Sequence, residues 1–514
     1  MTIKRLLLGL LTIFALFVIT HSLLDSWNQP QIQGRLELYQ TNLLLQASEW
    51  QGDKAGDANL TNARNALLGE SPLKTAQKQY EEARSEDRTT LEKLQARLEK
   101  LKSEADANPD TAKSEQPLQA SIKKVKQLIA ELDLRLGILQ ARQGQTETAI
   151  KTWTELINRS KQQASSELQI KPAAVLLGLW SNPPSLMVDA QPQIQQHLDG
   201  WFRDRALTKL YQVQERQEEL AALRAREQER AEAAAVKLAI VGAIPLVGVL
   251  VGVGLLIFLL AGVLIKGKEA ILAQNADLPW TTPWNAEIIW QVFVVGFFFI
   301  GQFLLPLFFS LLPLNRASFD TRTQAVFVLA SYAMLAFACL LVLYLSIRSF
   351  LPLPEGWFRF NWRGNWILWG LGGYLVALPL VIVVSLINQK LWQGQGGSNP
   401  LLPIALEGRD SVALAIFFLT AAVAAPLFEE FLFRGFLLPS LTRYMPVWGA
   451  ITLSSLFFAI VHLNLSEILP LATLGMVLGV VYTRSRNLLA PMLLHSLWNG
   501  GTLLSLFLLG SGSA

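Results

Sequence analysis

The chain has 514 residues, of which 51% are hydrophobic and 16% charged, and its formal net charge is only +4. So small a charge argues against a nucleic-acid partner, because nucleic-acid-binding surfaces are strongly basic. Residues 25–235 are polar, whereas 236–510 contain several runs of the roughly 20 apolar residues that cross a bilayer as a helix, so the sequence predicts a polytopic, all-α membrane protein and not a soluble one.

The N-terminal segment 1–24 begins with two basic residues, Lys4 and Arg5, and continues as a long apolar stretch. This pattern fits either a cleaved signal peptide or an uncleaved anchor. The apolar run is long and no small-x-small cleavage pattern follows it closely. We therefore expect an N-terminal membrane anchor whose first residues lie in the cytoplasm.

Residues 25–235 are expected to form an extramembrane helical domain. Charged residues interleave with leucines at helical spacing over 77–107, which favours a solvated helical hairpin over a long coiled coil because the apolar heptad signal is short. From residue 210 to Pro245 no helix breaker occurs. This absence predicts a stalk helix that runs straight into the membrane.

One stretch of this domain, 134–157, resembles a tetratricopeptide unit. Its features are a Leu-Gly pair at 136–137, a helix break at Gly144, and Ala149 and Trp153 where a second helix would pack. A solenoid needs at least three such units. A repeat-like docking surface for a protein partner and a plain helical domain therefore both remain open.

The remainder is predicted to hold about eight membrane helices, divided into accessory helices (236–364) and a C-terminal bundle (365–514). Gly248 and Gly252 form a small-xxx-small pair that favours helix packing. The glycine-rich loop 388–400 is expected to be a linker, with a substrate gate as the alternative. The expected helices lie near 237–265, 287–313, 323–347, 365–388, 411–442 (broken at Pro426), 447–462, 467–484 and 488–510.

Loop charges and tryptophans give an expected orientation. The side richer in Lys and Arg should be cytoplasmic, which places 25–235 on the opposite side of the membrane. The tryptophan-rich segments 278–285 and 356–366 fit an aromatic belt at the membrane interface. The richer side holds Lys4, Arg5, Lys266, Lys268, Arg348, Arg359, Arg363, Arg443, Arg484 and Arg486, and the other holds Arg316, Arg322, Lys390 and Arg409.

Three charged residues interrupt the apolar stretch "APLFEEFLFRG" at 425–435. A charge at mid-bilayer costs roughly 2.5–3.5 kcal/mol, so each should have a partner or a task. Pro426 can begin a helix, which would put Glu429 and Glu430 in a first turn that favours negative charge. Glu430 and Arg434 are four residues apart and can pair, while Glu429 points about 100° away and is left for another task.

Two further apolar segments carry polar side chains. His462 ends one of them, one turn after Phe458, and His495 and Asn499 lie four apart on the last helix. Because intramembrane ionisable groups usually face a bundle interior, we expect Glu429, His462, His495 and Asn499 to share one polar cavity. A carboxylate that takes a proton from water, histidines that position the water or bind a metal, and donors to an oxyanion are the parts needed to hydrolyse an amide.

The ordered set EExxxR, FxxxH and HxxxN resembles the CPBP family, which comprises type II CAAX prenyl endopeptidases and bacteriocin-processing or bacteriocin-immunity proteins. The resemblance covers roughly residues 365–510 and implies an intramembrane endopeptidase. It implies that Glu429 activates the attacking water, that His462 helps to hold it, and that His495 and Asn499 stabilise the oxyanion. Glu430 and Arg434 would brace the site, and Phe458 is expected to support it by packing.

The resemblance leaves the metal open, since family members are described both as metalloproteases and as metal-independent glutamate proteases. Glu429, His462 and His495 are the candidate ligands for a divalent metal such as zinc, a thin set for an ion that usually takes three protein ligands. We expect water activation by Glu429 without an obligatory metal. The substrate would be a membrane-associated peptide or protein, and no residue indicates whether it is prenylated.

Two other classes of function stay open. One is a non-catalytic scaffold or bacteriocin-immunity-type protein that keeps the site as a relic, and the other is a transporter that uses the polar cavity. The sequence lacks the repeat in two halves that many transporters show. A bacterial plasma membrane and an internal photosynthetic membrane fit the composition equally well.

One difficulty concerns depth in the membrane. Simple alternation of crossings puts Glu429 and His462 at different depths, because the helix 447–462 separates them. We expect either a break at Pro426 or a tilt of that helix to bring them together.

Overall fold

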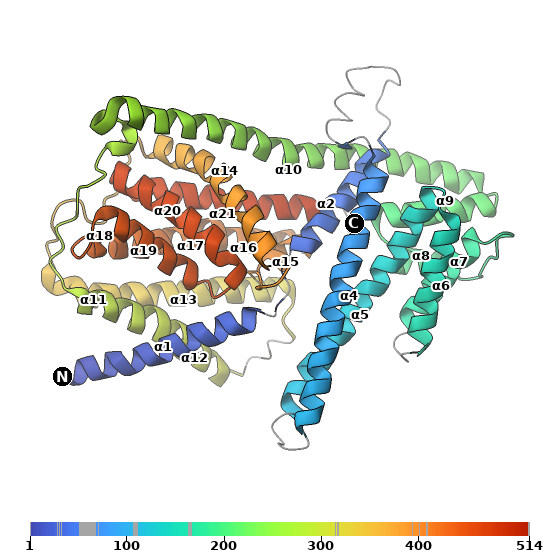
Figure 1. The fold of residues 1–514 in the computed structure, drawn as a ribbon, viewed down its shortest axis with the longest axis horizontal. Helices are drawn as coiled ribbons and strands as arrows, with labels where there is room; N and C mark the ends of the chain where they lie inside the picture. Colours follow the sequence, from blue (N-terminus) through green and yellow to red (C-terminus); the bar gives the residue numbers. More distant parts are fainter. Residues whose placement is uncertain are drawn as a thin grey trace. The chain divides into compact units, whose positions relative to one another are not determined.

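The computed structural model describes residues 2–27, 29, 31, 33–50, 68–69, 71–105, 112–162, 167–313, 315, 318–392, 394–399, 401–407 and 410–511. These residues are mostly helical and contain no β-strand, which confirms the predicted all-α class. The chain forms two compact units (Figure 1): a membrane unit, Met1–Ile32 with Gly242–Gly510, and a helical unit, Gln33–Val241 with Ser511–Ala514. The four-part division expected from the sequence stays a prediction.

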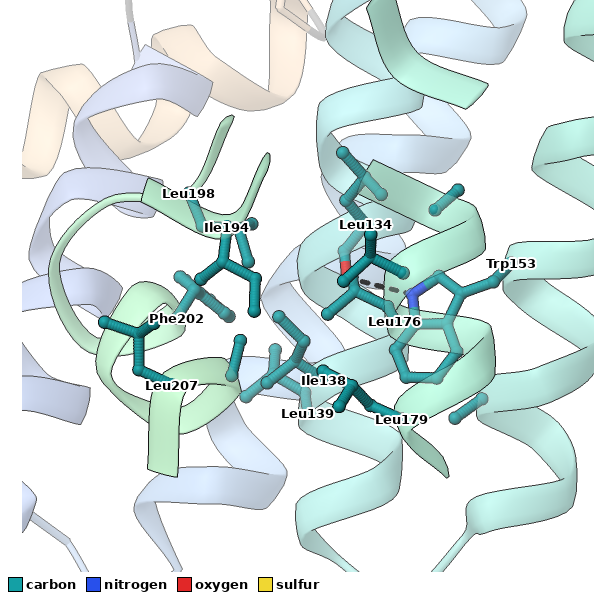
Figure 2. Packing of buried hydrophobic residues seen from close by; sticks show 14 of the residues in the cluster. Leu134, Ile138, Leu139, Trp153, Leu176, Leu179, Ile194, Leu198, Phe202 and Leu207 are labelled. Atoms are coloured by element: carbon teal, nitrogen blue, oxygen red, sulfur yellow. Dashed lines mark hydrogen bonds between the residues drawn. The ribbon is translucent and has the colours of Figure 1, made fainter. Parts of the chain in front are cut away.

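The helical unit is built around one core of leucines, isoleucines and aromatic residues (Figure 2). The two longest helices that lie wholly in this unit, α4 and α5, pack along each other, as the hairpin predicted around 77–107 requires. The unit comprises α2 (Gln33–Ser48), α4 (Pro72–Ala105), α5 (Ala112–Arg142), α6 (Thr146–Gln162), α7 (Glu167–Trp180), α8 (Ala190–His197), α9 (Gly200–Val213) and the first part of α10 (Gln217–Lys266).

The tetratricopeptide-like stretch folds as a helix–turn–helix. Gly144 adopts a φ of 81° in the turn between α5 and α6, a conformation that glycine adopts without strain. Ala149 and Trp153 are fully buried, and the Trp153 indole N–H donates to the Leu134 carbonyl at 3.2 Å. A Cβ on Gly137 would overlap the Trp153 ring, so the glycine of the Leu-Gly pair leaves the space that the indole occupies.

We expect Gly137→Ala to destabilise this helix pair by about 1–3 kcal/mol, because the added methyl overpacks a filled core. Hydrogen exchange of the full-length protein would measure it as lost protection of α5 and α6. Gly242→Ala is the matched control, since a Cβ there has no neighbour within 4 Å. Unchanged protection in Gly137→Ala would mean that Trp153 does not require this glycine.

The membrane unit agrees with the predicted spans except at one helix. Among the described residues, eight helices are long and apolar enough to cross a membrane. The segment predicted as 447–462 is not one of them: α19 (Val447–Ile460) has 14 residues, so it is only about 21 Å long. The eight are Ile3–Trp27, Gln217–Glu269, Ala286–Leu311, Thr321–Phe350, Trp366–Trp392, Ser411–Leu441, Leu465–Ser485 and Leu489–Gly510.

Several of these spans combine more than one helical segment. The third span begins as α11 (Ala286–Gln291), continues as a π-helix (Val292–Leu304) and ends as α12 (Leu305–Leu311). The short α15 (Leu401–Glu407) precedes the span Ser411–Leu441. The other helices used below are α1 (Ile3–Trp27), α13 (Thr321–Ile347), α14 (Trp366–Trp392), α20 (Ile468–Ser485) and α21 (Leu489–Gly510).

The small-residue pair on α10 packs as predicted. A Cβ on Gly252 would overlap the Leu375 carbonyl of α14, and one on Gly248 would come within 2.8 Å of Leu378. The two glycines therefore let α10 and α14 approach at backbone distance.

The glycine-rich loop is packed against the segment that follows α1. The Gln31 amide donates to the Gly394 carbonyl at 2.8 Å, and the Gly397 amide donates to the Gln29 carbonyl at 3.0 Å. The Ser466 amide, at the start of the seventh span, donates to Gly396. The N-terminal helix is thereby tied to the membrane unit, to which its contacts assign it.

Three tryptophans of the tryptophan-rich segments are buried in the protein, whereas Trp362 is 72% exposed. Trp280, Trp284 and Trp357 are 4%, 1% and 8% exposed, and the rings of Trp284 and Trp357 lie 4.3 Å apart. Their indole N–H groups donate within the protein, to Gly356, Ser440 and Thr281. Acceptors within the protein satisfy these three N–H groups, and an interfacial belt formed by the two segments stays a prediction.

Residues of the basic side gather at one end of the membrane unit. Arg484 donates to the Leu272 carbonyl at 2.6 Å and Arg443 to the Trp284 carbonyl at 2.5 Å, while Lys4 and Arg5 pair with Glu287, three residues after Trp284. Arg316 and Arg409 of the other side lie outside the described residues. That the basic end faces the cytoplasm stays a prediction.

Candidate active site

The two glutamates lie in the middle of a continuous helix. Ser411–Leu441 runs without interruption through Pro426, and Asp410 caps its start by accepting from the amides of Val412 and Ala413. The expectation that Pro426 begins a helix was wrong. Glu429 and Glu430 therefore gain nothing from a helix N-terminus, and side chains of other helices must stabilise them.

A π-helical turn accommodates Pro426 inside the helix. Proline has no amide hydrogen and its ring crowds the preceding turn, and here the π-turn Thr420–Ala424 precedes it. The Ala425 amide donates to Thr420 in this turn, which diverts it from its α-helical acceptor, Ala421. In a π-turn the amide of residue 426 would donate to the Ala421 carbonyl, but Pro426 has no amide hydrogen. The Ala421 carbonyl is therefore left without a helical partner.

Asn499 supplies that partner. Its side-chain Nδ2 donates to the Ala421 carbonyl at 2.8 Å from α21. Asn499 was predicted to stabilise an oxyanion, and here one of its two amide hydrogens is committed to main chain. The HxxxN motif thus also holds the widened turn that carries Pro426.

Glu430 and Arg434 form the ion pair predicted from their spacing. The Arg434 Nη1–Glu430 Oε1 distance is 2.8 Å, and the two side chains are 1% and 0% exposed. Arg434 also donates to the Gly475 carbonyl at 3.1 Å and its guanidinium lies 4.5 Å from the Phe458 ring centre. A side chain at Gly475 would meet Ser455 at 2.9 Å and Arg434 at 3.3 Å, so glycine is needed for this contact.

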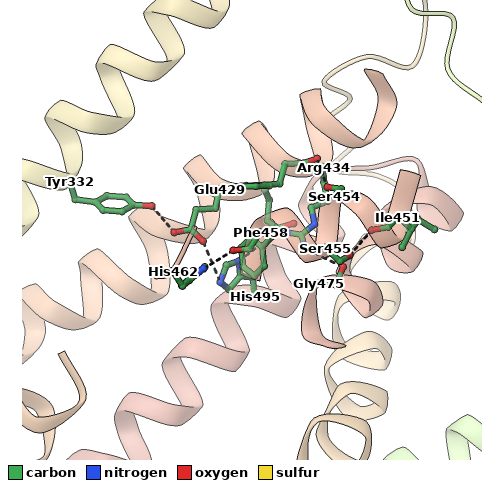
Figure 3. A network of polar contacts seen from close by, with 12 residues as sticks. Tyr332, Glu429, Arg434, Ile451, Ser454, Ser455, Phe458, His462, Gly475 and His495 are labelled. Atoms are coloured by element: carbon green, nitrogen blue, oxygen red, sulfur yellow. Dashed lines mark hydrogen bonds and ion pairs between the residues drawn. The ribbon is translucent and has the colours of Figure 1, made fainter. Parts of the chain in front are cut away.

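His495 lies between the two glutamates (Figure 3). Its Nδ1 is 2.8 Å from Glu430 Oε1, and its Nε2 is 3.9 Å from Glu429 Oε2. An ionised carboxylate only accepts hydrogen bonds, so Nδ1 carries the proton. Nε2 then faces Glu429 with a lone pair in the neutral ring and with a hydrogen in the protonated ring.

His462 is held in a defined tautomer by its own helix. Its Nδ1 is 2.7 Å from the Phe458 carbonyl, which can only accept, so the neutral ring presents a lone pair at Nε2. The Phe458 ring packs edge-on against His462 at 4.9 Å and His495 at 5.8 Å. Phe458, expected to pack, therefore contacts both histidines and Arg434 at once.

The short α19 resolves the difficulty of depth. From Glu429 the helix continues to Leu441, about 18 Å at 1.5 Å per residue, and α19 returns over about 21 Å before His462. The two side chains therefore reach a similar level although the helix at Pro426 is unbroken. The convergence comes from the length of α19, which is less than a full crossing.

A tyrosine that the sequence did not single out contacts Glu429. The Tyr332 hydroxyl, on α13, donates to Glu429 Oε1 at 2.9 Å. Glu429 is 16% exposed, in contrast to the fully buried Glu430. Of the two carboxylates, Glu429 is thus the more accessible.

The residues predicted as metal ligands are Glu429, His462 and His495. Among the described residues, no group of three or more His, Cys, Asp or Glu side chains could hold a metal ion. His462 and His495 both direct Nδ1–H to acceptors in the protein. These bonds leave Nε2 of both rings open, as in histidines that ligate a metal, so metal dependence of Glu429, His462 and His495 stays a prediction.

Comparisons with known proteins cover the segment that holds these residues. Residues 411–501, which include every motif residue, match the family model "Type II CAAX prenyl endopeptidase Rce1-like". The chain is 26% identical over 165 residues to the "Putative membrane peptidase YdiL" of Bacillus subtilis (32% of this chain, 65% of the relative). It is 25% identical over 218 residues to the "Membrane-embedded CAAX protease MroQ" of Staphylococcus aureus (41% and 86%).

A third relative, an uncharacterized 24.3 kDa protein of Escherichia coli, is 40% identical over 82 residues, which are 15% of this chain and 38% of the relative. No solved structure matches. The resemblance to the CPBP family is thereby confirmed, and the comparisons support a membrane protease of this type. With eight apolar spans in the part of it that the structure describes, the chain is an integral, multi-pass bacterial membrane protein.

Proposed function

We propose that the membrane unit is an intramembrane endopeptidase in which Glu429 activates water to hydrolyse a peptide bond of a membrane-associated substrate. The observation that carries this proposal is the position of Glu429. It is the accessible carboxylate of the cluster, its Oε1 is held by Tyr332, and its Oε2 faces His495. A positioned carboxylate beside histidines is what general-base catalysis requires.

The first step is attack by water. The 3.9 Å between Glu429 Oε2 and His495 Nε2 is too long for a direct hydrogen bond, but one water oxygen can contact both atoms. Glu429 takes a proton from this water while the water oxygen bonds to the scissile carbonyl carbon. His462 assists by accepting the second water hydrogen at Nε2.

The oxyanion formed in this step needs donors. Because His495 gives Nδ1–H to Glu430, it donates from Nε2 only when protonated, and Asn499 has a second amide hydrogen to offer. Glu429, Glu430, Arg434 and a protonated His495 carry charges that sum to zero.

The second step breaks the peptide bond. The oxyanion reforms the carbonyl, the C–N bond breaks, and Glu429 returns its proton to the leaving nitrogen. The products are a new carboxyl end and a new amine, so the residues of the site finish as they began. Glu430 and Arg434 act throughout as a brace for His495.

The substrate should approach from the bilayer, because the site lies midway along a membrane helix. One relative is named a CAAX protease, and a prenylated peptide is accordingly one candidate substrate for this chain. A plain peptide segment within the membrane is the other. Cleavage of matched peptides with and without a prenyl group separates the two.

We expect peptide cleavage by the purified protein to survive a chelator, because no proposed step uses a metal. The measurement compares initial rates in detergent with and without chelator, followed by added zinc. The initial rates with and without chelator are expected to agree within twofold. Loss of cleavage in chelator, restored by zinc, would replace this mechanism with one in which Glu429, His462 and His495 act on a bound metal.

A further inference from the structure

We propose that Tyr332 is a positioning residue for Glu429, so that the accessory helix α13 completes the active site. Tyr332 lies outside residues 411–501, the segment that matches the family model. Its hydroxyl nevertheless donates to the proposed general base at 2.9 Å. The inference rests on the proposed function and gives the accessory membrane helices a task.

The tyrosine ring is itself held in place. Tyr332 packs edge-on against Phe428, with ring centres 5.9 Å apart, and Phe428 is 4% exposed. Phe428 directly precedes Glu429, so one short stretch of the helix Ser411–Leu441 contacts both the ring and the hydroxyl. The ring contact with Phe428 and the hydroxyl bond to Glu429 together define where the two helices meet.

Polar contacts fix the register of α13 at both ends. Near its start, Arg322 pairs with Asp410 at 2.6 Å, the residue that caps the glutamate-bearing helix. Near its end, Ser346 accepts from Gln291 at 2.9 Å. Between them Cys339 lies against Gly296, where a Cβ would be 3.3 Å from the cysteine sulfur. Sliding α13 by one turn would break all three contacts.

The hydroxyl has a specific consequence for the carboxylate. A carboxylate has two equivalent oxygens and can exchange them by rotating about its last bond. The Tyr332 bond occupies Oε1 and leaves Oε2 directed at His495. The carboxylate is thereby oriented with one oxygen toward the water before the substrate binds, which is the kind of preorganisation on which catalytic rates depend.

Tyr332→Phe is the test, because it removes the hydroxyl and keeps the ring against Phe428. We expect kcat for peptide cleavage to fall about 10-fold, with KM and the melting temperature unchanged, since no contact with the substrate or the core is lost. Tyr344→Phe is the matched control: it lies on the same helix, and Tyr344 is 56% exposed. It should match the wild type in all three quantities.

The outcomes separate this inference from the proposed function when Glu429→Gln is measured in parallel. An inactive Glu429→Gln with a Tyr332→Phe whose kcat is within twofold of wild type overturns only the role of Tyr332. A fall in kcat accompanied by a lower melting temperature or a higher KM also overturns it, because Tyr332 would then be structural. A fully active Glu429→Gln would instead overturn the proposed function.

Discussion

Glu429→Gln is expected to reduce peptide cleavage at least about 10³-fold, within the range that general-base catalysis contributes. Glutamine keeps the size of the side chain and can still accept from the Tyr332 hydroxyl, but it cannot take a proton from water. The fold should therefore persist while the chemistry stops. Rates are measured on the purified protein with a pool of membrane-derived peptides, and folding by the melting temperature.

Glu287→Gln is the control for this change. Glu287 also lies in a membrane span, but it pairs with Lys4 and Arg5 at one end of the unit, and its variant should cleave within twofold of wild type. A Glu429→Gln protein that cleaves as fast as wild type would show that the site is misassigned. Absence of cleavage from the wild type as well would favour the scaffold or, if vesicles take up solute, the transporter.

The largest effect on stability is expected for Arg434→Met. Arg434 is the buried partner of Glu430, and removing one member of a buried ion pair leaves an uncompensated charge that costs about 3–5 kcal/mol. Glu430 would then face Glu429 and His495 without its counter-ion. Unfolding in mixed detergent micelles measures the loss, and cleavage should fall with it because His495 loses its brace.

The double variant Arg434→Met with Glu430→Gln tests the reason for this loss. It removes both charges, so it should recover most of the stability that the single variant loses. It should not recover cleavage, because a neutral glutamine holds His495 less firmly than a carboxylate. A double variant no more stable than the single one would mean that Arg434 acts mainly through Gly475 and Phe458.

The parts of the site that the sequence predicted are those governed by local spacing. Glu430 and Arg434 are one helical turn apart and pair, and His495 and Asn499 are likewise one turn apart on α21. Residues with charge in an apolar run must find partners, which is why the motif residues could be expected to gather. Their catalytic roles remain proposals.

The parts that could not be predicted depend on contacts between distant segments. Tyr332 meets Glu429 across 97 positions, and an isolated tyrosine in an apolar helix has no spacing that reveals its partner. Pro426 was wrongly predicted to begin a helix, because a π-turn and the Asn499 amide together satisfy the backbone around it. The burial of Trp280, Trp284 and Trp357 could not be predicted for the same reason, since their acceptors lie on other segments.

The helical unit shows a similar division. The helix–turn–helix of 134–157 followed from Gly144, Ala149 and Trp153, which act within one pair of helices. Whether this unit binds a protein partner stays a prediction, because the residues that form its core do not indicate what its surface contacts.

The most direct test of the central proposal is cleavage in water labelled with oxygen-18, in the presence of chelator. Hydrolysis by Glu429-activated water predicts new peptide carboxyl ends that each carry one labelled oxygen, present for the wild type and absent for Glu429→Gln. Mass spectrometry of the products reads this directly. New ends without label, or labelled ends formed equally by Glu429→Gln, would contradict the mechanism.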